Sequence, residues 1–176
     1  HEKRQKPPFT AGSGGISVVL GRDENGVLNA TGIAAANSDH MIGTVGADTL
    51  STNGMAGVSM KAGAGNDLLL INSTSMGSID GGMGFDTLQL IGAGRTMDFS
   101  VVGSEALSGI ERFLMMDTSQ TIRLGLDDVF SLLQQSSDGK LRIAENGGGG
   151  NVTSFIIDDH GGSSGSFTGL SAAMGF

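Results

Sequence analysis

DGGMGFDTLQL, residues 80–90, places three glycines and two aspartates directly before an alternating apolar pattern. Within it, GGMGFDTLQ at 81–89 has two related stretches before it, GTVGADTLS at 43–51 and AGAGNDLLL at 62–70, and each begins nineteen residues before the next. A constant period with in-register apolar positions predicts repeats that stack to build one core, because a single repeat cannot bury its apolar side chains alone. Two apolar columns follow this spacing, namely Met41, Met60, Ile79 and Leu50, Leu69, Leu88.

The composition favours many tight turns between short strands. Glycine accounts for 31 of 176 residues, whereas there are only two prolines and no cysteine, tryptophan or tyrosine. A chain of this length is expected to form one domain. Because disulfides are excluded, a secreted protein of this composition would need another stabilising element, and a metal ion is the obvious one.

The charge pattern disfavours some partners and suits others. The formal net charge is −8, although Lys3, Arg4 and Lys6 lie in the first six residues. The excess of acidic over basic residues argues against nucleic acid and anionic membranes as binding partners and suits divalent cations. No apolar run approaches the ~18 residues of a membrane span, and no signal-peptide pattern opens the chain. Because the chain begins with His1 rather than Met, we interpret it as part of a longer protein.

The third repeat meets the pattern G-G-x-G-x-D-x-U-x in full, and this pattern resembles the calcium-binding repeats-in-toxin (RTX) family. The first repeat departs from it at Thr44 and the second at Ala62, but both keep the fourth-position glycine and the sixth-position aspartate. The resemblance implies an all-β fold, a right-handed parallel β-roll or β-helix solenoid with short strands and glycine-rich turns. We expect one short helix in addition.

The residue types at this spacing suit calcium. Glycines let a turn curl its backbone carbonyls toward one point, and calcium takes 6–8 oxygen ligands from carbonyls and carboxylates. Three stacked turns would enclose two sites, one between Asp48 and Asp67 and one between Asp67 and Asp86. The alternative is that these turns hold no metal and only connect strands. The candidate metal residues are Asp48, Asp67, Asp86, Gly43, Gly46, Gly63, Gly65, Gly82 and Gly84.

The opposite edge of the repeats differs. TNGMAG (52–57) and NSTSMG (72–77) contain no carboxylate, so we expect that edge to be free of metal.

The flanking sequence predicts further short elements. Residues 15–33 are interpreted as two strands joined at 23–26 that form earlier coils of the roll. Leu126, Val129, Phe130 and Leu133 follow helical spacing, with Asp127 placed to cap the helix. Alternating apolar residues predict strands at 96–102, 110–116, 121–126, 140–144 and 152–158.

These elements define the expected domain boundaries. Residues 1–14 are expected to be a linker, and 15–159 a single domain with calcium repeats at 41–90 and motif-free coils at 91–159. Residues 160–176 are expected to be a flexible Gly/Ser-rich tail.

Two functions remain open. LSGIERFLMMDTSQTIRLGLDDVFSL, residues 107–132, resembles a segment that follows calcium repeats in large type I-secreted adhesins. This favours a calcium-binding structural or adhesion module at the bacterial cell surface or in the medium, without enzymatic activity. The alternative is the accessory calcium domain of a type I-secreted protease, lipase or epimerase, which a catalytic motif upstream in the parent chain would reveal. Expected partners are calcium and neighbouring domains, and a role toward a surface peptide or glycan stays open.

Overall fold

The computed structural model describes residues 16–73, 75–101, 106–145, 154–158 and 165–168. Within these residues the chain is mostly short strands with one α-helix. In chain order the elements are β1 (Ser17–Arg22), β2 (Leu28–Ile33), β3 (His40–Ile42), β4 (Thr49–Ser51), β5 (Val58–Ala64), β6 (Leu68–Ile71), β7 (Met76–Met83), β8 (Thr87–Leu90), β9 (Thr96–Asp98), β10 (Leu107–Ser108), β11 (Arg112–Met115), β12 (Thr121–Gly125), α1 (Leu126–Gln135), β13 (Arg142–Glu145), β14 (Ser154–Asp158) and β15 (Gly165–Thr168).

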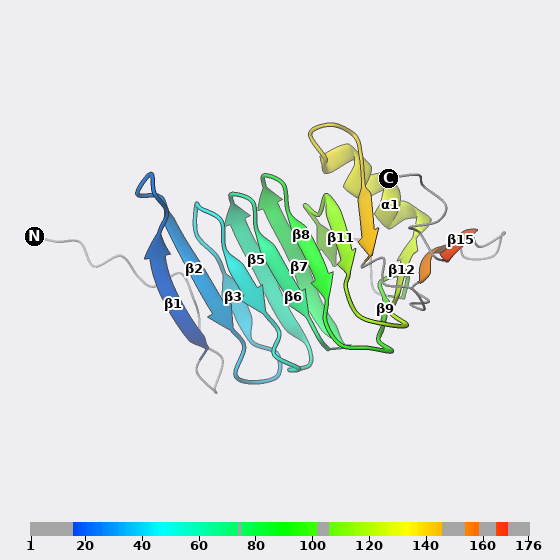
Figure 1. Ribbon diagram of the computed structural model, residues 1–176, viewed down its shortest axis with the longest axis horizontal. Helices are drawn as coiled ribbons and strands as arrows, with labels where there is room; N and C mark the ends of the chain where they lie inside the picture. Colours follow the sequence, from blue (N-terminus) through cyan, green and yellow to red (C-terminus); the bar gives the residue numbers. More distant parts are fainter. Residues whose placement is uncertain (1–15, 74, 102–105, 146–153, 159–164, 169–176) are drawn as a thin grey trace, which may run out of the picture.

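The strands form three sheets. A seven-stranded sheet has the order β1-β2-β4-β6-β8-β11-β13, and two four-stranded sheets have the orders β10-β7-β5-β3 and β15-β14-β12-β9. Strand pairs are parallel except β1–β2 and β14–β15, which are antiparallel. Figure 1 shows the strands lying side by side along the long axis of the molecule, from blue β1 at one end to the α1 region at the other.

Each nineteen-residue repeat contributes one strand to each of two sheets. In the seven-stranded sheet Leu50 pairs with Leu69 and Leu69 with Leu88. Each residue therefore lies beside the residue nineteen positions later in the chain. In the facing sheet Met41 pairs with Met60 and Met60 with Ile79. All six side chains are at most 1 % exposed, which confirms both predicted apolar columns.

Beyond the third repeat the chain adds a third sheet. After β8 it passes through β9 in the new sheet and β10 before returning to the seven-stranded sheet as β11. Phe113 of β11 pairs with Leu88 of β8, so this circuit takes twenty-five residues instead of nineteen. The core here contains phenylalanines, with ring centroids 6.5 Å apart for Phe99 and Phe113 and 6.0 Å apart for Phe113 and Phe155. Larger side chains fill the interior where a third sheet joins the other two.

The predicted helix is confirmed as α1, but its predicted cap is wrong. Oδ2 of Asp128, not the side chain of Asp127, accepts the backbone N–H of Gly125 at 2.9 Å. Leu132 is the fully buried leucine of the helix, while Phe130 is 55 % exposed. The helix therefore packs through a face slightly rotated from the one its apolar spacing predicts.

The two strands predicted in 15–33 are confirmed, but they form an antiparallel hairpin. β1 is therefore not an earlier coil of parallel strands. In the turn between them, Oδ1 of Asp23 accepts the N–H groups of Asn25 and Val27 at 2.9 and 2.8 Å. This hairpin occupies the outer edge of the seven-stranded sheet.

The strands predicted after the repeats are all found: β9, β11 and β12 are shorter than predicted, and β13 and β14 border residues outside the described part of the chain. In the segment expected to be a flexible tail, residues 165–168 form β15 and pair with β14. The segment expected to be a linker, 1–14, lies outside the described residues, as does the remainder of 160–176.

Candidate metal centre

The three glycine-aspartate turns lie against one another at one edge of the sheets. Gly82 and Gly84 in the third repeat have φ values of 96° and 137°. A Cβ at Gly82 would overlap the carbonyl oxygen of Gly63, and one at Gly84 that of Gly65. A Cβ at Gly63 would in turn overlap the carbonyl of Thr44. Glycine is required here both for the backbone angle and for the close approach of neighbouring turns.

The first repeat makes the same contacts with its neighbours. A Cβ at Gly43 would overlap the carbonyl oxygen of Ala62, and one at Gly46 would overlap that of Leu28. All six glycines predicted as metal residues therefore lie where adjacent backbones meet.

The three aspartates of the repeats form a continuous hydrogen-bonded row. The backbone N–H of Asp48 donates to Oδ1 of Asp67 at 2.7 Å, and that of Asp67 donates to Oδ1 of Asp86 at 2.8 Å. The N–H of Ala30 in β2 extends the row by donating to Oδ1 of Asp48 at 2.6 Å. All three aspartates are at most 2 % exposed. The structure thus brings together the carboxylates that the sequence predicts as neighbours.

Two of these carboxylates have a buried oxygen without a partner. Oδ2 of Asp67 and Oδ2 of Asp86 are both inaccessible to solvent and accept no hydrogen bond. A buried charged oxygen without a partner is strongly unfavourable. A cation or a proton at these two oxygens would remove that cost.

Asp48 differs from the other two aspartates, because Thr44 satisfies it. The backbone N–H of Thr44 donates to Oδ2 of Asp48, and its hydroxyl donates to Oδ1 at 2.8 Å. The hydroxyl oxygen also lies 2.7 Å from the carbonyl oxygen of Leu28. Threonine replaces the second glycine of the motif only in this repeat, so the first turn holds its carboxylate through protein groups.

The pKa values of Asp67 and Asp86, the two aspartates with an unpartnered oxygen, are both raised. Burial raises the pKa of Asp67 to about 7, with repulsion from Asp86 and Asp48 adding to the shift. Burial raises the pKa of Asp86 to about 6, with repulsion from Glu111 and Asp80 adding. Both shifts express the cost of placing a negative charge among other carboxylates in a site shielded from water.

A fourth carboxylate, that of Glu111, extends the row beyond the repeats. Its Oε2 accepts the backbone N–H of Asp86 at 2.7 Å, and the residue is 3 % exposed. Glu111 is not among the residues predicted from the sequence, because it follows Asp86 by twenty-five residues and belongs to no glycine-rich turn. The available signal was the apolar register: Glu111 precedes the buried Phe113 by two residues, as Asp86 precedes Leu88.

The opposite edge of the repeats is built from neutral polar side chains over most of its length. The hydroxyl of Thr52 lies 2.8 Å from Oδ1 of Asn72, and the two belong to the stretches predicted to lack carboxylates. Asp39, one turn earlier, is fully buried at this edge and accepts the N–H groups of Ala35 and Ala36 through Oδ2. Its Oδ1 has no partner. The sequence prediction did not include this residue.

The oxygens at the stacked turns come from side chains and from the backbone together. Within the described part of the chain, no group of three or more His, Asp or Glu side chains is placed to hold a metal ion. An ion at this edge would therefore need backbone carbonyls beside the carboxylates of Asp67 and Asp86. Mixed carboxylate and carbonyl donors are the ligands that calcium takes.

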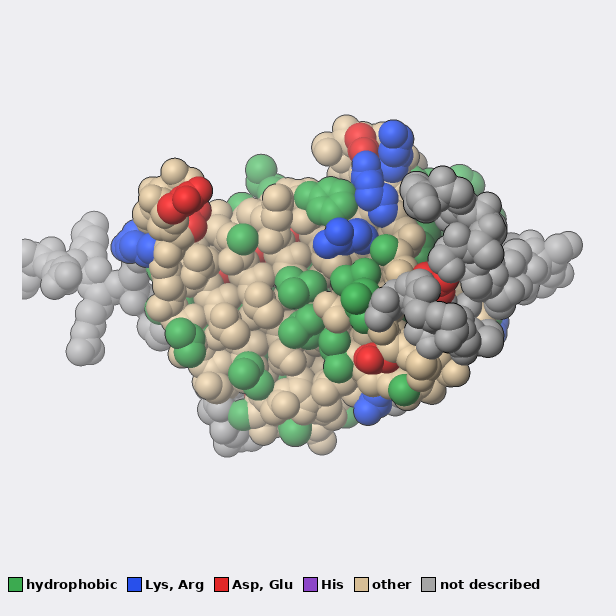
Figure 2. All heavy atoms as spheres, viewed as in Figure 1, with side chains coloured by type: hydrophobic (Ala, Val, Ile, Leu, Met, Phe, Trp, Pro, Cys, Tyr) green, Lys and Arg blue, Asp and Glu red, His purple; other side chains and the backbone are tan. Residues whose placement is uncertain are grey.

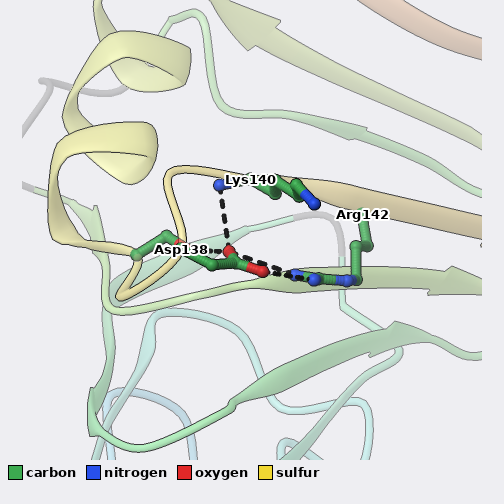
Figure 3. Close-up of polar contacts among 4 residues, drawn as sticks. Asp138, Lys140 and Arg142 are labelled. Carbon is green, nitrogen blue, oxygen red and sulfur yellow. Dashed lines mark hydrogen bonds and ion pairs between the residues drawn. The ribbon is translucent and has the colours of Figure 1, made fainter.

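An aromatic side chain links the third turn to the segment after α1. Phe85 lies beneath two guanidinium groups, with Arg112 at 5.7 Å and Arg142 at 5.2 Å from the ring centroid. Arg142 also pairs with Asp138, whose carboxylate accepts the N–H of Lys140 at 3.1 Å (Figure 3). The Arg142 guanidinium lowers the pKa of Asp138 to about 2. These contacts attach the loop between α1 and β13 to the turn that carries Asp86.

The face of the molecule shown in Figure 2 is sparsely charged over its central strands. In the face shown in Figure 2, Lys and Arg side chains gather near the α1 end and few charged side chains lie over the central strands. An open groove of about 480 Å³ follows the sheet that contains β3, β5, β7 and β10. Its polar lining comes from His40, Ser59, Lys61, Ser78, Asp80 and Ser108.

No protein-family model, curated protein or solved structure matches this chain. Among the described residues, no helix is long and apolar enough to cross a membrane. Any function must therefore be inferred from the residues of the site itself.

Proposed function

We propose that this chain is an RTX-like β-roll whose stacked turns bind calcium. The observation that carries the proposal is the pair of buried, unpartnered oxygens, Oδ2 of Asp67 and Oδ2 of Asp86. Both lie in turns whose backbones meet too closely to admit a side chain. The alternation of strands between two parallel sheets every nineteen residues supports the β-roll.

The donor chemistry favours calcium over magnesium. Calcium accepts 6–8 oxygens at about 2.3–2.6 Å in irregular geometry, whereas magnesium demands an octahedron at about 2.0–2.1 Å and retains its water. Glycine-rich turns supply carbonyl oxygens at positions set by backbone stacking, not by an octahedron. In the β-roll, Asp67 and Asp86 with neighbouring turn carbonyls would hold the ions, and the ions would neutralise a row of carboxylates that otherwise repel one another.

The biological role that follows is a structural or adhesion module of a large type I-secreted bacterial surface protein. Calcium binding to the folded chain alone adds stability of about 2.7 kcal/mol per site when calcium is at 100 times the dissociation constant. Two such sites contribute as much as the net stability of many small domains. At the low calcium level of a cytosol the fold would be less stable, which would favour export, and calcium outside the cell would stabilise it. The resemblance of 107–132 to adhesin segments supports this role over an accessory enzyme domain.

Circular dichroism during calcium titration tests the proposal, with magnesium titrated in parallel. We expect calcium to increase the strand signal and the unfolding temperature, and magnesium at equal concentration to leave both nearly unchanged. The matched control is Asp67→Asn combined with Asp86→Asn, which keeps the side-chain shape but removes both charges. Equal responses to the two ions, or an unaltered calcium response in the double variant, would contradict the proposal.

A further inference from the structure

The carboxylate row continues past the last repeat of the motif. Glu111 occupies the next position of the row, because its Oε2 accepts the N–H of Asp86 just as Oδ1 of Asp86 accepts the N–H of Asp67. The strand register agrees, since Arg112 pairs with Thr87 in adjacent parallel strands. A buried carboxylate therefore follows Asp86 in space although no glycine-aspartate turn follows it in sequence.

The space between the third repeat and the Glu111 segment is lined by oxygens. A Cβ at Gly81 would overlap the carbonyl oxygen of Gly109 and would lie 2.8 Å from Oδ2 of Asp86. That Oδ2 atom is the buried oxygen without a partner. The residue of the second repeat equivalent to Gly81 is Ala62, which is fully buried. Its methyl group occupies the place that is free of a side chain at Gly81. Gly43 leaves the same position without a side chain in the first repeat, but there Oδ2 of Asp48 accepts the N–H of Thr44. Among the three repeats, only the third combines a glycine at this position with an aspartate oxygen that has no partner.

We propose that Asp86 Oδ2, the Gly109 carbonyl and the Glu111 carboxylate hold a further divalent cation, calcium by their chemistry. The inference rests on the proposed calcium function and adds a site that the repeat motif does not encode. All three donors are hard oxygens, and two carry negative charge, which suits calcium. Water molecules would complete the 6–8 ligands.

This site would join the repeats to the rest of the domain. The N–H of Gly109 donates to Oε1 of Gln135, the last residue of α1, at 2.6 Å. An ion on the Gly109 carbonyl would therefore connect Asp86 of the third repeat with the turn that α1 contacts. Ion binding at this position would stabilise the β10–β11 turn and the helix end together.

Native mass spectrometry and titration calorimetry on Glu111→Gln test the site, with calcium as the probe. The glutamine carbonyl can still accept the Asp86 N–H, so the hydrogen bond is kept and the charge is lost. The control is Glu24→Gln in the exposed β1–β2 turn. We expect the Glu111 variant to bind one calcium fewer, or to bind its weakest calcium at least tenfold less tightly, with the control unchanged. Unaltered stoichiometry and affinity in Glu111→Gln would overturn the inference while leaving the repeat sites intact.

A second variant decides the case if Glu111→Gln does not fold. Gly81→Ala puts a methyl group into the proposed ion position, where it meets the Gly109 carbonyl oxygen, so the two turns must move apart to accept it. Ala62 shows that the second repeat accommodates a methyl group at the equivalent position. Loss of one calcium from a folded Gly81→Ala protein supports the site, and full stoichiometry overturns it. Failure of the proposed function has a separate signature, namely wild-type protein that binds no calcium at all, and that result would overturn both proposals.

Discussion

The backbone N–H of Asp67 donates a 2.8 Å hydrogen bond to Oδ1 of Asp86, nineteen residues later in the chain. Each aspartate in the row thereby orients the next carboxylate, leaving its second oxygen to face the stacked turns. Where the second oxygen has no partner, as in Asp67 and Asp86, the turn is suited to an ion. Where Thr44 donates to it, as in Asp48, the turn is already satisfied.

The three aspartates should therefore differ in their calcium response. We expect Asp67→Asn and Asp86→Asn each to lower the calcium-dependent gain in unfolding free energy by about 1–3 kcal/mol, roughly the contribution of one site. Asp48→Asn should lower that gain by less, because both oxygens of Asp48 are hydrogen-bonded within the protein. Urea unfolding with and without calcium measures the differences. Equal losses at all three positions would show that Asp48 also ligates an ion.

Without calcium, stability should fall as pH rises through the range where Asp67 ionises. Its pKa is raised from 3.8 to about 7 by burial, so the folded state keeps a proton that the unfolded chain releases. The unfolding free energy then decreases from about pH 4 to about pH 7 and levels off above. Thermal unfolding of calcium-depleted protein at pH 5 and pH 8 should show this decrease, and Asp67→Asn should reduce it. A pH dependence identical in both proteins would contradict the assigned pKa.

The hydroxyl of Thr44 should stabilise the first turn independently of calcium. It donates to Oδ1 of Asp48 at 2.8 Å, with the Leu28 carbonyl oxygen 2.7 Å away, and the residue is 9 % exposed. Thr44→Val leaves these groups without the hydroxyl, and we expect a loss of about 1–3 kcal/mol. The exposed Thr31 provides the control as Thr31→Val, with little expected effect. Denaturant unfolding in saturating calcium and in chelator should give the same loss for Thr44→Val.

The repeat spacing was sufficient to predict the stacked turns, because backbone stacking requires a constant chain length per repeat. That constraint places Leu50, Leu69 and Leu88 in one column and their aspartates in one row. The helix and the later strands were also recognisable, since their apolar periodicity reflects the same core.

The features that the sequence did not reveal depend on contacts between distant segments. Glu111 joins the row only because β9 lengthens one circuit from nineteen to twenty-five residues. The sequence shows Thr44 only as a departure from the motif, whereas in the structure its backbone N–H and hydroxyl hydrogen-bond the Asp48 carboxylate. β1 pairs with β2 in the antiparallel direction. An alternating apolar pattern is the same in parallel and antiparallel strands, so it does not predict that direction.

Truncating the central core column should be costly whether or not calcium is bound. Leu69 is 0 % exposed between Leu50 and Leu88, so Leu69→Ala leaves a cavity that the paired strands cannot close. We expect a loss of about 2–5 kcal/mol. The neighbouring Leu70 points away from the column and is only half-buried, so Leu70→Ala should cost clearly less. Chemical denaturation of both variants measures the two losses in unfolding free energy. Similar losses would contradict the assignment of Leu69, and not Leu70, to the core.

Glycine in the turns serves two purposes, and one pair of variants separates them. Gly84 has a φ of 137° and lies against the carbonyl of Gly65, whereas Gly94 has a φ of 68° with no atom within 4 Å of an added Cβ. Gly94→Ala carries only the cost of a left-handed backbone, about 1–2 kcal/mol. Gly84→Ala also forces the turns apart. We expect it to be the more destabilising variant and, unlike Gly94→Ala, to weaken calcium binding, as urea unfolding and calorimetry would show. If both variants lost the same stability and kept full calcium affinity, close stacking of the second and third turns would not be needed for the ion sites.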